Sequence, residues 1–365
     1  MLGPFLQSLQ DPRLVASFQR RCGLFLQAGD GASVSSSNAC GNQAVSRGFV
    51  ENERVIRTSA CTNGYGRNTA GESLQHLQGR EGKEGPELNG SVLKVVMYLG
   101  QASKDIIKWP RPSSPPVVKL ETRVDAEYGM PSTHAMAATA ISFTFLLATM
   151  YRYKYSFVLG LMASTALSTL VSLSRLYTGM HTVLDVICGI LLTAVLMGLT
   201  YPFWDVLDNL QLTSPLTPVI AVVMPFLMSY NYPELDHYSP TRGDTTIILA
   251  VASGCTIGFW MNYQYGQTYE PVGSLPFEIP SITLQVALMS SARFLIGIVV
   301  LVATRLIVKT LSLKVLYAWF NVPEYNLEAR KRLEIEVPYK FATYSSIGFI
   351  ATVIVPLLYQ LLKLL

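Results

Sequence analysis

The chain contains few charged residues for its length. Asp, Glu, Lys and Arg together make up 14% of its 365 residues, against about 25% in an ordinary soluble domain. Half of the residues are hydrophobic, and the mean hydropathy is positive at +0.32. A chain of this length would suit two soluble domains, but its composition indicates one polytopic membrane domain with polar ends.

Several chemical features are also missing. The net charge is only +4, and no dense block of Lys and Arg with interleaved aromatic residues occurs, so nucleic acid is not expected as a partner. The five cysteines are scattered and contain no CxxC pair, which argues against a disulfide framework or a cysteine metal site. Polar residues between Gln7 and Arg13 interrupt the apolar start of the chain, so no signal-peptide core is expected there.

The chain changes character near residue 90. Residues 27–90 are rich in Gly, Ser, Asn and Gln and poor in large apolar residues. Such a segment cannot bury enough surface to offset its chain entropy, so residues 1–90 are predicted to form a polar, largely disordered region. Beyond it, apolar runs recur at the length that a helix needs to cross a bilayer.

We therefore predict an all-α, polytopic transmembrane bundle of about seven or eight spans over residues 91–365. The mixed segment 311–340 is a candidate for a helix that lies on the membrane surface. The candidate spans are roughly residues 91–109, 133–151, 155–174, 182–203, 215–230, 245–263, 284–308 and 342–363.

Ionisable residues near membrane spans are costly and indicate function. In "KDIIKWPRP", Lys104 and Arg111 are two helical turns apart, on one face of a helix that the prolines end. In "MPSTHAM", Ser132 or Thr133 is a good N-cap, and His134 follows in the first helical turn. Free N–H groups at such a helix start form a ready anion site.

A third cluster, "SRLYTGMHTVLD", contains Arg175 at the end of one span and His181 at the start of the next. Asp185 follows His181 by four residues, so a carboxylate faces the imidazole on one side of the helix. The first cluster lies at the end of one span and the second at the start of the next, so both lie on one side of the membrane. The chain then crosses to the other side and comes back before it reaches the third cluster. All three clusters are therefore predicted to share one membrane face.

The combined set suits phosphoryl transfer. Taken singly, each residue has a more ordinary reading, such as an interface anchor or a packing histidine. Together, His181 is the predicted nucleophile, Asp185 orients it, and His134 serves as general acid and then base. No ligand set for zinc or paired magnesium is evident, so a reaction without metal or cofactor is predicted. The predicted phosphate-binding groups are Lys104, Arg111, Arg175 and the backbone amides of Ser132 and Thr133.

These clusters resemble the signature of the type 2 phosphatidic acid phosphatase superfamily, K-x6-R-P, P-S-G-H and S-R-x5-H-x3-D. All spacings match, and Thr133 stands where many members have glycine. Flanking segments such as "KWPRPSSPPVVKLE" and "EARKRLEIEVPYKF" are similar to the sphingosine-1-phosphate phosphatases. The resemblance implies the helical fold of the superfamily. It also implies an endoplasmic reticulum enzyme that dephosphorylates sphingosine 1-phosphate and its dihydro relative.

Other interpretations stay open at this level. The signature also suits a broader lipid phosphatase acting on phosphatidic or lysophosphatidic acid. A catalytically silent membrane protein is another alternative, because residues 27–90 are polar where the family has an upstream helix. A transporter is less consistent with cations at a membrane face. The resemblance implies a lumenal site, whereas the basic residues between Lys309 and Arg332 favour a cytosolic one.

Overall fold

The computed structural model describes residues 2–26, 34–36, 90–121, 126–267, 276–279, 281–323 and 326–364. Of the region predicted to be largely disordered, 1–90, residues 27–90 fall almost wholly outside these ranges, whereas residues 2–10 and 12–21 are helical. The all-α prediction is confirmed, and the one sheet in the described part is an antiparallel ladder of β1 (Leu24–Leu26) and β2 (Val34–Ser36). The helices are α1 (Leu2–Gln10), α2 (Pro12–Arg21), α3 (Gly90–Ile107), α4 (Thr133–Thr149), α5 (Phe157–Tyr177), α6 (Val183–Thr200), α7 (Trp204–Thr213), α8 (Thr217–Tyr230), α9 (Thr241–Gln264), α10 (Leu284–Trp319), α11 (Leu327–Arg330), α12 (Leu333–Phe349) and α13 (Val355–Leu361).

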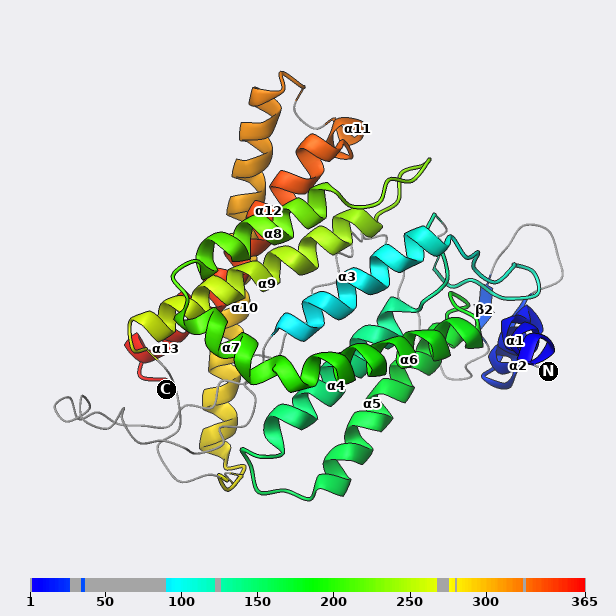
Figure 1. The fold of residues 1–365 in the computed structure, drawn as a ribbon, viewed down its shortest axis with the longest axis horizontal. Coiled ribbons are helices and arrows are strands. Elements are labelled where there is room, and N and C mark those ends of the chain that lie inside the picture. The colour runs from blue at the N-terminus through cyan, green and yellow to red at the C-terminus, as the bar shows by residue number, and fades with distance from the viewer. Residues whose placement is uncertain are drawn as a thin grey trace.

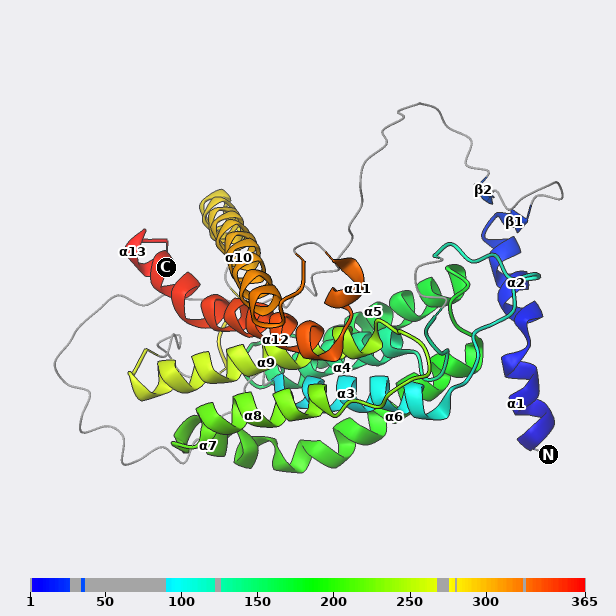
Figure 2. The ribbon, with the colours of Figure 1, turned by 90° about the horizontal axis from the view of Figure 1, so that it is seen from above.

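The helices form two groups joined by α3. Figure 1 shows α4, α5 and α6 in one group and α8, α9 and α12 in the other, and α3 contacts α4, α6 and α9. The helix α10 packs mainly on α12 and runs at a steep angle to α8, α9 and α12 in Figure 2. The same view places α1 and α2 at the opposite end of the molecule from α13.

Many of these helices have the length and composition of membrane spans. Five stretches meet both criteria: α5, α9, α10, residues 183–213 and residues 333–361. The apolar helices α4 and α8 are shorter. Many large apolar side chains are exposed on the outward faces of these helices, and lipid can solvate them where water cannot. The chain is therefore a multi-pass membrane protein, while the number of spans stays a prediction.

Close backbone contact joins α9 to α12. A methyl group added at Gly254 would collide with backbone atoms of Ser345 and Phe349, and one at Gly348 would collide with Val251. Small residues that let helix backbones approach are the usual device of helix packing in membranes, where lipid is as apolar as the side chains. The two glycines therefore allow α9 and α12 to pack with their backbones in contact within the C-terminal group of helices.

Residues 311–340 do not form the predicted surface helix but contain the end of one long helix and the start of another. The helix α10 continues to Trp319, and α12 begins at Leu333. Two charges of this segment are paired inside the protein: Glu336 accepts from Arg242 of α9 at 2.7 Å and from Lys340 at 3.2 Å. Others, such as Glu328 and Lys331, stay exposed.

Candidate active site

The predicted site residues lie where helices begin and end. Lys104 is in the last turn of α3, and the positive φ of Lys108 marks the turn out of that helix. The positive φ of Gly179 forms the turn between α5 and α6, and a side chain there would collide with the Val118 backbone. His181 follows this turn and stands directly before α6.

The start of α6 is held by a capping box. The Thr182 hydroxyl accepts from the Asp185 amide at 3.3 Å, and the Asp185 carboxylate accepts from the Thr182 amide at 2.7 Å. The carbonyl of Asp185 also accepts the backbone N–H of Ser132 at 3.0 Å. Gly189 permits this approach, since a side chain there would lie 2.9 Å from the Ser132 carbonyl. The second and third clusters are thus joined directly.

The two cations of the first cluster meet on one carboxylate. Oε2 of Glu127 lies 2.9 Å from Nζ of Lys104 and 3.2 Å from Nη2 of Arg111. Arg111 also donates from Nε to the Glu127 carbonyl and from Nη1 to the Met180 carbonyl, both at 2.8 Å. These bonds hold the guanidinium beside the residue that precedes His181. Sequence reasoning missed Glu127.

His181 is buried, with 2% of its surface exposed. Burial lowers the pKa of its imidazole to about 4, and the positive charges of Arg111 and Lys104 act in the same direction, while Asp185 opposes them. The ring is therefore neutral at pH 7 and keeps a lone pair for attack. Its Nδ1 lies 3.7 Å from Oδ2 of Asp185, which is beyond hydrogen-bond distance. The orienting role of Asp185 stays a prediction.

The start of α4 differs from the prediction in one respect. The amide of Ser132 was expected to bind phosphate, but it donates to the Asp185 carbonyl instead. The amide of Thr133, in the first turn of α4, has no acceptor within that helix. The hydroxyl of Ser132 is buried without a hydrogen-bond partner in the described part of the chain. The Thr133 amide and this hydroxyl are therefore two of the groups that an anion could use at the start of α4.

The remaining two site residues stand at the same helix ends. His134 is exposed in the first turn of α4. Arg175 lies in the last turn of α5, where its Nε donates to the Ser174 hydroxyl at 3.2 Å. Its carbonyl accepts the Met180 amide, so one residue links Arg175 to Arg111. The direct roles of His134 and Arg175 stay predictions.

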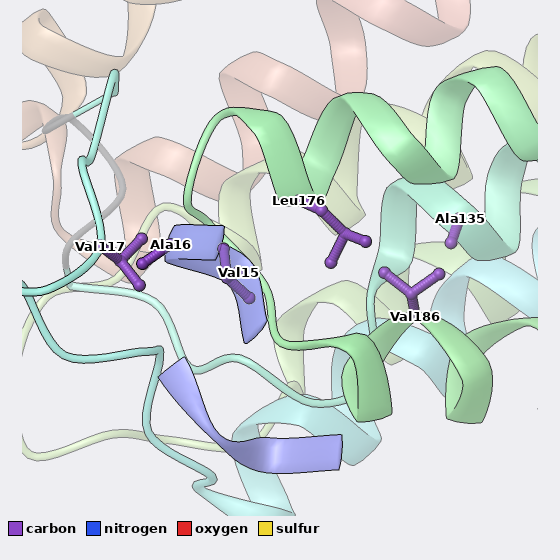
Figure 3. Packing of buried hydrophobic residues seen from close by; sticks show 6 residues of the cluster. All are labelled: Val15, Ala16, Val117, Ala135, Leu176 and Val186. Carbon is purple, nitrogen blue, oxygen red and sulfur yellow. The ribbon is translucent and has the colours of Figure 1, made fainter. Parts of the chain in front are cut away.

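An apolar cluster adjoins the site along the chain, and Figure 3 shows its six members. Its members come from α2, the loop after α3, α4, α5 and α6, and several adjoin site residues in sequence. Gln19 of α2 fastens the same region: Nε2 donates to the carbonyls of Val118 at 2.7 Å and Tyr177 at 2.9 Å. Its Oε1 accepts the Val118 amide at 2.9 Å. The cluster consists of Val15, Ala16, Val117, Ala135, Leu176 and Val186.

Comparison with known proteins supports the resemblance seen in the sequence. The PAP2 superfamily matches residues 90–207. Sphingosine-1-phosphate phosphatase 2 of Mus musculus is 49% identical, and that of Homo sapiens is 48% identical, each over 100% of both chains. Sphingosine-1-phosphate phosphatase 1 of Rattus norvegicus is 39% identical over 73% of this chain and 62% of its own.

No solved structure matches the chain. The resemblance of the flanking segments to the sphingosine-1-phosphate phosphatases is confirmed by the full-length identity to their second form. Together with the helical fold and the junction of the three signature clusters, these findings establish that the chain belongs to the sphingosine-1-phosphate phosphatase family, within the PAP2 superfamily.

Proposed function

We propose that this chain hydrolyses the phosphate of sphingosine 1-phosphate, and of its dihydro relative, in the endoplasmic reticulum membrane. The observation that carries the proposal is the position of His181, a buried imidazole next to Met180, whose carbonyl accepts from Arg111. Burial, and after it the charges of Arg111 and Lys104, lowers the pKa of this imidazole to about 4. This arrangement supports His181 as a nucleophile beside two cations suited to a phosphate dianion.

Attack begins at Nε2 of His181, because Nδ1 faces Asp185. A bond forms between Nε2 and phosphorus while the bond from phosphorus to the substrate's O1 breaks. His134, in its protonated form, donates its proton to the departing alkoxide, which leaves as the free sphingoid base. The phosphorylated imidazole carries a positive charge, and the Asp185 carboxylate beside it stabilises that charge.

A water molecule completes the reaction. His134, now neutral, accepts a proton from water while the oxygen bonds to phosphorus and the bond to Nε2 breaks. Inorganic phosphate leaves, His181 returns to its neutral form, and His134 is protonated again. Lys104, Arg111 and Arg175 stabilise the phosphoryl oxygens in both steps. Every atom in this cycle comes from the chain, the substrate or water.

The test is phosphate release from sphingosine 1-phosphate by membranes that contain the full chain, beside His181→Ala. We expect release from the wild-type chain and none above background from the variant. His76→Ala is the control, because this histidine belongs to none of the three signature clusters. Release that persists in His181→Ala at equal expression would contradict the nucleophile assignment. No release from the inserted wild-type chain would favour a catalytically silent protein.

The runner-up function is a broader lipid phosphatase. Activities toward sphingosine 1-phosphate, phosphatidic acid and lysophosphatidic acid, measured on the same membranes, separate the two. We expect the highest kcat/KM for the sphingoid substrate, because the full-length identity extends beyond the catalytic signature. Equal values for all three lipids would support the broader function.

A further inference from the structure

The carboxylate of Glu127 occupies the place expected for the substrate's phosphate. Its Oε2 contacts both Lys104 and Arg111, and the three side chains are between 2% and 10% exposed. A carboxylate and a phosphate dianion repel each other strongly at contact distance in such a setting. Phosphate therefore takes these cations only when the Glu127 side chain turns away.

Hydrogen bonds hold the backbone around Glu127 in place, so only the side chain moves when it turns away. The Glu127 carbonyl accepts from Arg111 at 2.8 Å, and the Gly129 amide donates to the Trp109 carbonyl at 2.7 Å. Nε2 of His237 lies 2.9 Å from the Ala126 carbonyl. A displaced carboxylate thus stays within one side-chain length of the bound phosphate. A charged group buried there needs a cationic partner.

The proposed substrate has such a partner in the right place. A sphingoid-base phosphate bears an ammonium group on C2, next to the carbon that carries the phosphate ester. Phosphatidic and lysophosphatidic acid have no cation at that position. When the sphingoid phosphate takes Lys104 and Arg111, its own ammonium arrives beside the carboxylate that it has displaced.

A polar cavity adjoins this side of the site. It has a volume of about 300 Å³ and borders residues 126–128 through His237, and its lining includes the acidic Asp105, Glu234 and Asp236 and the basic Arg242 and Lys331. Asp105 accepts from Tyr232 and Thr241 on Oδ2, whereas its Oδ1 is buried without a partner in the described part of the chain. Oδ1 of Asp105 is thus an acceptor on this side of the site that a donor group can still use.

We propose that Glu127 is the specificity-determining residue for the amino group of the substrate. It pairs with Lys104 and Arg111 in the empty site and with the C2 ammonium in the occupied one. The inference rests on the proposed function, because it concerns the same phosphate site. An amine-free lipid phosphate leaves the carboxylate without a cation and binds less well for that reason.

The test compares two substrates of equal chain length, sphingosine 1-phosphate and lysophosphatidic acid, on wild-type chain, Glu127→Gln and Glu278→Gln. Glu278 is the matched control, since its side chain is 84% exposed and pairs with Lys154 elsewhere on the surface. Glu127→Gln should lower kcat/KM for sphingosine 1-phosphate by about 10- to 100-fold, the range of a charge-assisted hydrogen bond. For lysophosphatidic acid it should leave kcat/KM unchanged or raise it. The control should change neither.

Equal losses on both substrates would overturn the proposal, because Glu127 would then only position Lys104 and Arg111. Unchanged values on both substrates would overturn it as well. A measurement that needs no variant uses N-acetylated sphingosine 1-phosphate, whose amine is neutral. The wild-type chain should hydrolyse it at least about 10-fold less efficiently than the parent lipid, and equal efficiency would refute the ammonium site. Absence of hydrolysis of every lipid tested would instead refute the proposed function.

Discussion

Replacement of Gln19 by alanine should release α2 from the active site. Gln19 is 1% exposed and makes three hydrogen bonds to backbone groups of Val118 and Tyr177. The variant leaves these backbone groups unpaired, and each such group costs about 1–3 kcal/mol when it stays buried. Water reaches part of the space that Gln19 leaves, so we take a total cost of about 3 kcal/mol for the three lost hydrogen bonds. This cost lowers the equilibrium constant for docking of α2 by about 100-fold.

Hydrogen–deuterium exchange measures this change. Protection of amides in α2 and in residues 113–120 should fall by about 100-fold in Gln19→Ala, and phosphate release should fall with it, since Tyr177 lies just before the turn to His181. Gln7→Ala is the control, because Gln7 is exposed on α1. Exchange in α2 that matches the wild-type chain would refute the reasoning that Gln19 docks this helix.

Three further predictions concern the chemistry. Because burial lowers the pKa of His181 to about 4, the imidazole is neutral above that pH and protonated below it. The acid limb of phosphoenzyme formation should therefore lie near pH 4, and a limb near the ordinary value of 6.5 would contradict this. In His134→Ala, labelled phosphoenzyme should still form from a substrate with a good leaving group, whereas none should form in His181→Ala. EDTA should leave phosphate release intact, and inhibition reversed by a divalent ion would overturn the predicted metal-free mechanism.

Sequence predicts well those parts of the site that depend on residues close together in the chain, such as prolines, a glycine and the signature residues. Prolines end α3 and precede α4, and the positive φ of Gly179 forms the turn before α6, so the signature residues sit at helix ends. Alternation of spans across the bilayer then predicts that Lys104, Arg111 and His181 share one face. The structure places these three residues within electrostatic range of one another.

The missed features depend on contacts between distant segments. Glu127 contacts Lys104 across 23 residues of chain, with no helical spacing to suggest the pair. Gln19 reaches Val118 and Tyr177 across 99 and 158 residues. Asp185 shows a different limit, since its spacing to His181 did not reveal that its carboxylate also accepts the nearer Thr182 amide as a cap. Local backbone donors compete with the side chain four residues away.

The hydrogen bond from the Ser132 amide to the Asp185 carbonyl has a mechanical consequence. It fastens the first turn of α4, which holds the Thr133 amide, to the first turn of α6, which follows His181. The predicted phosphate cradle and the predicted nucleophile are thus joined through a single peptide group. A shift of the first turn of α4 on binding an anion is therefore expected to reach His181 by this route.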